Sequence, residues 1–392
     1  MPERGQTLPA PVKGLSFVSL FNDFASEMVY PVLPAFITGP LGGTALALGT
    51  LDGAADLTAA LVRGVSGRLA DRKGRTKPLI LLGYGVAVLI RPIIALASSA
   101  WQVIGFRVID RVGKGMRTPP RDAVIASITD TRIRGRAFGF NRAMDHLGAV
   151  LGSLAAWALL QARVGVREVI GWSAVPGVVA VIVLVFALKG VNGRAPSHRE
   201  PRSGEAISRA DAVGIAYWVP VSVLVLLTVG RLPETLLLFR LQQLGVPVVV
   251  VPLAWAGLHV IRSSSSYPGG WLTDRLGPRW TYALGIAVYL VVALLLALAL
   301  REIAALGVFL LFGLVAGLTE PAERVVVGKL APIRTGRGFG NYQGLAGLAA
   351  LPAGIAFGRV YQTVGGSAAL MLSAAVLAGA TVAWLWVGRR FS

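Results

Sequence analysis

The sequence contains no cysteine and only three histidines among its 392 residues. The absence of cysteine excludes disulfide bonds, thiolate metal sites and cysteine nucleophiles. The histidines His146, His198 and His259 are not clustered, so we predict no histidine metal site and, more broadly, no firm metal site. The sequence also lacks a Gly-x-x-x-x-Gly-Lys-Ser/Thr motif and any catalytic-triad signature. We therefore expect no enzyme, no bound cofactor and no direct use of ATP.

Charged residues are scarce as well, at 15% of the chain against about 25% in an average soluble protein. Hydrophobic residues make up 55% of the chain and are gathered in long runs. Such runs indicate a polytopic membrane protein. The first 13 residues are polar and the first apolar run is long enough to remain as a span. We therefore expect no cleavable signal peptide.

Each long run covers the roughly 20 residues that a helix needs to cross a bilayer. The predicted spans are 14–38, 44–66, 78–97, 101–124, 136–161, 168–188, 214–239, 248–270, 279–299, 304–327, 337–361 and 366–388. A segment rich in Gly, Pro, Ser and Arg separates the first six from the last six. We predict an all-α membrane protein with an N-terminal bundle (1–189), a mobile cytoplasmic linker (190–212) and a C-terminal bundle (213–392).

The formal net charge is +19, and its placement predicts the topology. Basic residues gather in alternate loops, including 68–77 and 189–209, whereas the intervening loops, such as 98–100, carry almost none. By the positive-inside rule, both termini and the linker are cytoplasmic. The membrane topology thus accounts for the excess of basic residues, and we expect no binding to nucleic acid. The expected location is the plasma membrane, which is the inner membrane of a bacterium.

Two motifs occur twice, about 200 residues apart. Gly67–Arg75 (Gly-Arg-Leu-Ala-Asp-Arg-Lys-Gly-Arg) returns as Gly270–Arg279 (Gly-Trp-Leu-Thr-Asp-Arg-Leu-Gly-Pro-Arg). Arg134–Gly139 returns as Thr335–Gly340 at nearly the same separation. This agreement indicates an internal duplication. Duplicated membrane bundles with matching loops are typical of secondary transporters.

The motif that begins at Gly67, between the second and third spans, resembles the loop 2–3 signature of the major facilitator superfamily. Its second copy falls between spans 8 and 9, where that family has its own. The resemblance covers essentially the whole chain and implies twelve transmembrane helices in two pseudo-symmetric six-helix bundles. In the family, the acid of the motif helps to lock the cytoplasmic side shut, which implies this role for Asp71, with Arg121 as a possible partner.

Under the internal repeat, Asp122 corresponds to Glu323, and this pair is a candidate for a duplicated gate. The predicted conformational gate consists of Gly67, Asp71, Arg72, Arg121, Asp122, Asp274, Arg275 and Glu323. The basic residues of the first motif, including Arg72, also suit simple cytoplasmic anchors.

Span 4 carries cations at helical spacing: Arg107, Arg111, Lys114 and Arg121. Each charge at the bilayer centre costs ~2.5 kcal/mol or more, so this stripe must line a wet cavity or pair with acids. Arg111 also fits an Arg-x-x-x-Gly pattern that the family ties to proton coupling. The surrounding string, 110–123, resembles a subgroup of predicted bacterial efflux permeases.

The pair Gly148 and Gly152 in span 5 resembles the glycine-rich signature of drug/proton antiporters. Ser153 stands where that signature has proline. The same spacing also fits small-xxx-small helix packing. The sequence leaves both interpretations open.

Span 1 places Asp23 and Glu27 four residues apart, hence on one helix face, with Tyr30 one turn further on. Two carboxyl groups so close together in a weakly hydrated place should not both ionise readily, which suits a proton carrier. A hard-cation site and a structural ion pair with Arg91 or Arg111 are the alternatives.

The candidate proton-coupling or cation-binding residues are Asp23, Glu27 and Arg111. The predicted substrate cavity comprises Tyr30, Asp52, Asp56, Arg91, Lys114, Asp145, Glu234 and Glu320. The leading hypothesis is a monomeric, proton-coupled exporter of a small organic molecule that works by alternating access in the lipid bilayer. Its energy source would be the proton gradient. The alternatives are a divalent metal cation exporter and a proton-coupled organic anion transporter.

Overall fold

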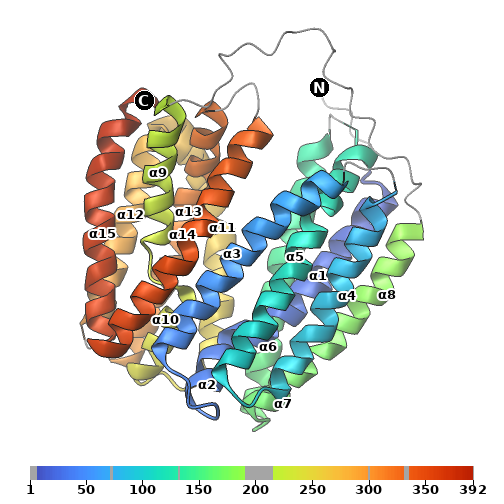
Figure 1. The fold of residues 1–392 in the computed structure, drawn as a ribbon, viewed down its shortest axis with the longest axis horizontal. Helices are drawn as coiled ribbons and strands as arrows, with labels where there is room; N and C mark the ends of the chain where they lie inside the picture. The colour runs from blue at the N-terminus through green and yellow to red at the C-terminus, as the bar shows by residue number, and fades with distance from the viewer. Residues whose placement is uncertain are drawn as a thin grey trace.

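The computed structural model describes residues 7–70, 74–130, 133–189, 215–298, 301–330 and 335–391. Its helices run side by side in two bundles (Figure 1). The first contains α1 (Ala10–Val29), η1 (Tyr30–Val32), α2 (Leu33–Thr38), α3 (Ala45–Ala70), α4 (Thr76–Ile93), η2 (Ile94–Leu96), α5 (Ala100–Ile128), α6 (Arg134–Gln161), α7 (Val166–Trp172) and α8 (Ala174–Lys189). The second contains α9 (Ile215–Val229), α10 (Glu234–Gln243), α11 (Val251–Leu276), α12 (Pro278–Ala297), α13 (Glu302–Leu330), α14 (Thr335–Thr363), α15 (Gly366–Val387) and η5 (Gly388–Phe391).

Within the described residues these helices combine into twelve membrane-length rods, because α1–η1–α2, α4–η2, α7–α8 and α9–α10 each continue in one direction. The predicted fold class, an all-α bundle of twelve spans, is confirmed. The predicted linker 190–212 lies outside the described residues. The domain boundaries on either side of it therefore stay a prediction.

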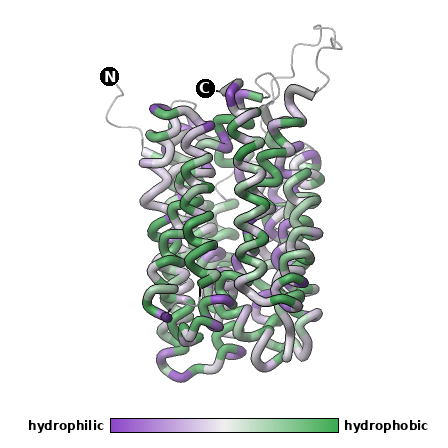
Figure 2. The backbone as a smooth tube through the Cα atoms, turned by 90° about the vertical axis from the view of Figure 1, so that its left-hand side faces the viewer, coloured by the Kyte–Doolittle hydropathy of each residue, from purple (hydrophilic) through white to green (hydrophobic). Residues whose placement is uncertain are grey.

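Nine of the rods in the described part of the chain are apolar enough to be recognised as spans from length and composition alone. The other three, α1–η1–α2, α5 and α11, are interrupted by polar and charged residues, so composition alone does not mark them as spans. Hydrophobic residues dominate the middle of the molecule and hydrophilic ones gather toward its ends (Figure 2).

Both copies of the repeated motif end in the same backbone geometry. Gly74 has φ +78° just before α4, and Gly277 has φ +81° between α11 and α12. This left-handed region is strained for residues with a Cβ, so glycine allows the tight turn there. The two glycines lie at matching positions of the two bundles, as the internal repeat implies.

The two bundles meet most closely where α3 crosses α14. Gly49 and Gly53 of α3 face Gly354 and Gly358 of α14, so the two backbones touch. A Cβ at Gly53 would lie 2.6 Å from a carbonyl oxygen of α14, and a Cβ at Gly358 would lie 2.8 Å from one of α3. Small residues at four-residue spacing allow this approach.

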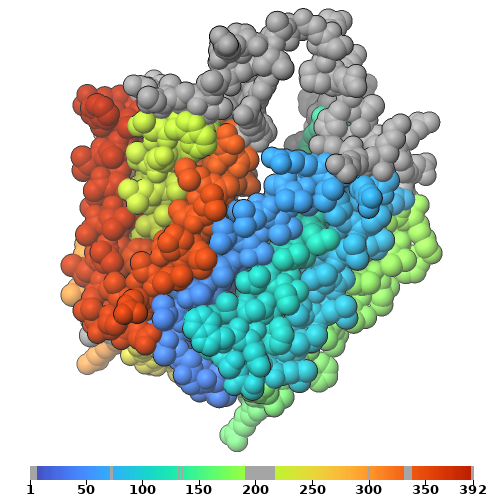
Figure 3. Space-filling view, viewed as in Figure 1, coloured from blue at the N-terminus to red at the C-terminus, as the bar shows by residue number. Residues whose placement is uncertain are grey.

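This glycine contact lies toward one end of the molecule. We call the end where α1 begins and α15 ends the terminal end, and the opposite one the distal end. The contact involves the distal half of both helices, and the space-filling view shows α3 and α14 in continuous contact there (Figure 3). Toward the terminal end the two helices diverge (Figure 1). The bundles are thus closed at the distal end.

Candidate functional site

A cavity of about 750 Å³ lies between the bundles. Residues of α1, η1, α3 and α5 line one side, and residues of α9, α10, α11, α13 and α14 line the other. It reaches from Tyr30 and Asp52 to Arg63, Arg324 and Phe339, which lie nearer the terminal end. Six of the residues predicted for the substrate cavity line it: Tyr30, Asp52, Asp56, Lys114, Glu234 and Glu320.

Asp52 joins the two bundles at the distal floor of this cavity. Its Oδ2 accepts hydrogen bonds from the Thr235 backbone N–H at 3.0 Å and from the Thr235 hydroxyl at 2.8 Å. Its Oδ1 accepts the Tyr30 hydroxyl at 3.1 Å. The α10 helix begins after a break at 230–233, and Pro233, its own N-cap residue, supplies no side-chain bond. Asp52 of the first bundle therefore caps a helix of the second.

Glu27 makes a second link between the bundles. The indole Nε1–H of Trp255 donates a hydrogen bond of 2.8 Å to Glu27 Oε2, and His259 Nε2 lies 3.9 Å from the same oxygen. Tyr30 packs against Trp255 with ring centroids 5.2 Å apart. Glu27, predicted as a proton-coupling residue, therefore lines the cavity and contacts the opposite bundle.

A cluster of three cations, Arg63, Arg111 and Lys114, forms the wall of the first bundle. Among the described residues, no ion pair or side-chain hydrogen bond satisfies them, and the buried Nε atoms of Arg63 and Arg111 lack a partner. The Asp56 carboxylate interacts electrostatically with all three. Arg111, the third predicted coupling residue, is thus part of the cavity wall.

The second bundle carries paired charges on the facing wall. Arg262 donates to Glu234, and its guanidinium lies 5.5 Å from the centroid of the Trp255 ring. Arg324 lies 3.7 Å from Glu320, one turn away on α13. Glu323 also lines the cavity, as does Arg231.

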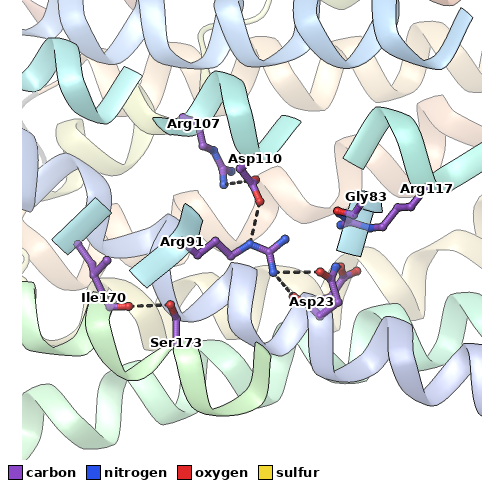
Figure 4. A network of polar contacts seen from close by, with 9 residues as sticks. Asp23, Gly83, Arg91, Arg107, Asp110, Arg117, Ile170 and Ser173 are labelled. Carbon is purple, nitrogen blue, oxygen red and sulfur yellow. Dashed lines mark hydrogen bonds and ion pairs between the residues drawn. The ribbon is translucent and has the colours of Figure 1, made fainter. Parts of the chain in front are cut away.

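A buried ion-pair network adjoins the cavity, which its member Arg107 lines (Figure 4). Arg91 donates through Nε to Asp110 Oδ1 at 2.9 Å and through Nη1 to the Asn22 carbonyl at 2.8 Å. Arg107 donates to the other Asp110 oxygen at 3.2 Å. The side chains of Arg91, Arg107 and Asp110 are at most 2% exposed. Arg91, predicted for the substrate cavity, is held instead between α1, α4 and α5, because Asp110 turns toward α4.

Asp23 and Asp145 are likewise absent from the described lining of the cavity. Asp23 accepts a hydrogen bond of 2.9 Å from the Asn22 amide, beside the Arg91 network (Figure 4). Asp145 lies 3.9 Å from Arg142 on the same face of α6. Asp23 and Glu27 share a helix, but only Glu27 reaches the cavity. Arg91 forms its ion pair with Asp110, and not with Asp23 as the structural alternative proposed.

The described residues of the predicted gate are spread over four helices, α3, α5, α11 and α13. Asp71 and Arg72 fall outside the described residues, so the proposed lock between Asp71 and Arg121 stays a prediction. Arg121 forms an ion pair of 2.9 Å with its neighbour Asp122. It also donates a hydrogen bond of 2.6 Å to the Ser19 hydroxyl. Asp274 and Arg275 are exposed near the terminal end of α11, where Arg275 lies 4.1 Å from the Trp271 ring centroid. Gly67 lies opposite Pro119 of α5.

Two further expectations concern metals and packing. In the part of the chain that the structure describes, no three His, Asp or Glu side chains converge as a metal site. Gly148 and Gly152 pack directly against the backbone of α1 near Leu20 and Phe24. Their spacing therefore serves helix packing in this structure.

Sequence reasoning missed four features of the site. Trp255 and Thr235 bind the carboxylates of the first bundle, and no sequence signal marks them. Asp110 was within the charged string of span 4 but was not singled out. The glycines of the α3–α14 contact follow a Gly-x-x-x-Gly pattern in both helices, at 49–53 and 354–358, which could have revealed them.

Two six-rod bundles around a cavity that is closed at one end define a polytopic membrane transporter. The sequence model of the Major Facilitator Superfamily matches residues 15–261. The chain therefore belongs to the major facilitator superfamily of secondary transporters.

Individual relatives agree with this assignment. An uncharacterized MFS-type transporter of Methanocaldococcus jannaschii is 27% identical over 371 residues, covering 92% of this chain and 90% of that protein. The multidrug resistance protein MdtH of Photorhabdus laumondii is 31% identical over 147 residues, which are 38% of this chain and 36% of MdtH.

Solved structures share the fold. A bacterial homolog of the human lysosomal transporter Spinster, in an inward-facing and occupied conformation, has a TM-score of 0.76 at 15% identity, covering 97% of this chain and 96% of that one. The peptide transporter POT, in complex with sulfate, has a TM-score of 0.79 at 15% identity, covering 100% and 96%. The chain is thus a multi-pass integral membrane protein, and its fold is that of a transporter rather than of an enzyme.

Proposed function

We propose that this protein exports a small organic molecule by alternating access and that a proton gradient drives the export. In this proposal the two bundles rock about the central cavity. The closed distal end faces the outside, and the divergent terminal end faces the cytoplasm. In this proposal both termini are cytoplasmic, which the basic loops favour, and the membrane is the plasma membrane, the inner membrane of a bacterium. The working unit is a monomer, because two bundles suffice to enclose the cavity.

The observation that carries the proposal is the pair of carboxylates that bridge the bundles. Glu27 accepts a hydrogen bond from Trp255, and Asp52 accepts two from Thr235. A hydrogen bond to a charged acceptor is stronger than one to a neutral acceptor. Protonation of either carboxylate therefore weakens the closed distal end. Protonation of these carboxylates thus shifts the equilibrium between the closed and the open distal end, which links proton binding to the conformational change.

The direction of transport rests on a resemblance to an efflux protein. The relative MdtH bears the name multidrug resistance protein, and its match covers 147 residues. The cavity volume of about 750 Å³ lies within the range of sites for small organic ligands. Both observations support the export of a small organic compound.

The test uses proteoliposomes with an acidic interior and four labelled probes that share one aromatic ring. The probes are benzoate, phenylphosphonate, benzyl alcohol and benzyltrimethylammonium. We expect at least one of them to accumulate in the acidic vesicles and to leave when a protonophore dissipates the gradient. Asp52→Asn and Glu27→Gln should each abolish this accumulation without unfolding the protein. Arg359→Gln, an exposed residue of α14 outside the cavity, is the matched control and should transport normally.

Two outcomes would contradict the proposal. The first is accumulation that persists after the protonophore. The second is normal, gradient-driven accumulation in both carboxylate variants.

A further inference from the structure

The charges that line the cavity are unevenly placed once their ion pairs are considered. Glu234 is bound to Arg262, and Glu320 lies beside Arg324. Arg107 is bound to the buried Asp110, whereas Asp52 and Glu27 accept hydrogen bonds from neutral donors of the opposite bundle. Among the described lining residues, the cations without an ion pair are Arg63, Arg111, Lys114 and Arg231. Positive charge is therefore concentrated locally where these cations lie.

Three of these four cations lie on one wall, that of the first bundle. Arg111 and Lys114 are three residues apart on α5, hence on one face, and Arg63 of α3 adds its charge to theirs. The Nε atoms of Arg63 and Arg111 are buried without a hydrogen-bond partner. Asp56 offsets one of the three charges. Arg63, Arg111 and Lys114 thus line the cavity with more positive charge than the described carboxylate beside them, Asp56, offsets.

An aromatic surface adjoins the same wall. Tyr30, Trp255 and Phe312 line the cavity, and the ring of Trp255 packs against that of Tyr30. Arg111 lies close enough to Tyr30 for the two to interact electrostatically. A ligand with a ring next to its charged group can reach both surfaces at once.

We propose that the cavity binds an organic oxyanion. The carboxylate or phosphoryl group of the ligand accepts hydrogen bonds from Arg63, Arg111 and Lys114, and its apolar body lies against Tyr30 and Trp255. Guanidinium groups suit such oxyanions because their planar donors match two oxygens at once. This inference rests on the proposed transport function and specifies its substrate class.

The experiment measures binding to the purified protein in detergent, independently of transport. Benzoate, phenylphosphonate, benzyl alcohol and benzyltrimethylammonium share a ring and differ in charge, and inorganic phosphate has the charge without the ring. A ligand that binds the folded state raises the midpoint of thermal unfolding. We expect benzoate and phenylphosphonate to raise it. We expect benzyl alcohol, benzyltrimethylammonium and inorganic phosphate to have little effect.

The variants Arg111→Gln and Lys114→Gln each remove one donor charge. Each should weaken the binding of benzoate by about tenfold or more, because a charge-assisted hydrogen bond is lost. Arg359→Gln removes a cation outside the cavity and should leave the dissociation constant unchanged. The midpoint of thermal unfolding of each variant without ligand shows whether that variant is folded. If one of the two variants does not fold, the other still tests the inference.

Three results would overturn the inference. The first is tighter binding of benzyltrimethylammonium than of either anion. The second is equal affinity for benzoate in the wild type and in both glutamine variants. The third is binding of inorganic phosphate as tight as that of phenylphosphonate, which would remove the aromatic body from the assignment. Anions that bind here but do not accumulate in the vesicle experiment would leave this inference standing and count against the proposed transport function.

Discussion

The hydrogen bonds between Asp52 and Thr235 should determine how often the distal end opens. Asp52 is the sole side-chain cap of α10 that the structure shows among the described residues, and it comes from the opposite bundle. When the bundles separate at this end, these bonds must break. The substitution Asp52→Ala removes them from the closed state and changes nothing comparable in the open state, where water surrounds the site.

The size of the expected shift in the closed–open equilibrium follows from the hydrogen bonds that Asp52→Ala removes. The N-cap bond to the backbone N–H contributes about 1 kcal/mol. The bond from the Thr235 hydroxyl adds about 0.5–1.5 kcal/mol. Asp52→Ala should therefore shift the closed–open equilibrium by about 1–3 kcal/mol, which raises the open fraction by about 5- to 150-fold. Asp52→Asn keeps one acceptor oxygen and should raise it by about fivefold.

The assay exploits the absence of native cysteine, because a single introduced thiol is then the only one labelled. Ala45→Cys is a suitable reporter, since Ala45 is 5% exposed and its carbonyl oxygen lies against Gly358 at the α3–α14 contact. A membrane-impermeant maleimide reaches it only when the distal end opens. If opening and closing are fast relative to labelling, the labelling rate is proportional to the open fraction.

The matched control is Asp56→Asn, one helical turn from Asp52. Asp56 lines the cavity without a hydrogen bond to the second bundle among the described residues, so the labelling rate should stay within about twofold of wild type. Equal labelling rates in the wild type, Asp52→Ala and Asp56→Asn would refute the view that Asp52 holds the distal end closed.

Three further substitutions test other parts of the structure. Gly53→Val should hold the distal end open and raise the same labelling rate, because a Cβ there would lie 2.6 Å from a carbonyl oxygen of α14; a rate at or below the wild-type value would contradict this. Asp110→Asn should lower the free energy of unfolding by about 3–5 kcal/mol, since two buried guanidinium groups lose their carboxylate, and a midpoint of thermal unfolding equal to that of wild type would disprove it. Trp255→Phe removes the donor to Glu27 but keeps a ring, and should raise the labelling rate about fivefold; no change would mean that this bond does not hold the bundles together.

The fold could be predicted because its signals are long and redundant. The apolar runs predict the spans, and the repeated loops predict the duplication. Composition alone fails for α1, α5 and α11, yet helical spacing of the charges still indicates that α5 is a helix with one polar face. The breaks inside the first and seventh rods follow local proline and glycine, at 31–34 and 230–233, and were not predicted.

The site could be predicted only in part, because the sequence gives helix faces but not their neighbours. Asp23 and Glu27 share a face, but packing of α6 against α1 turns only Glu27 toward the cavity. Asp110 and Arg111 are adjacent, hence about 100° apart around the helix, so they must face different neighbours. Which of them faces the cavity depends on the tilt and rotation of α5. Long-range partners such as Trp255 depend on how the two bundles meet, and no local pattern records this.

The central claim, that transport is coupled to protons through the carboxylates that bridge the bundles, has one direct test. Phenylphosphonate, which is ionised near neutral pH and does not cross the bilayer unaided, is added to proteoliposomes that contain a trapped pH indicator. Proton movement is recorded in the wild type, Asp52→Asn and Glu27→Gln. The account predicts proton movement opposite to phenylphosphonate in the wild type and none in either variant. Phenylphosphonate transport without proton movement, or undiminished proton movement in both variants, would contradict it.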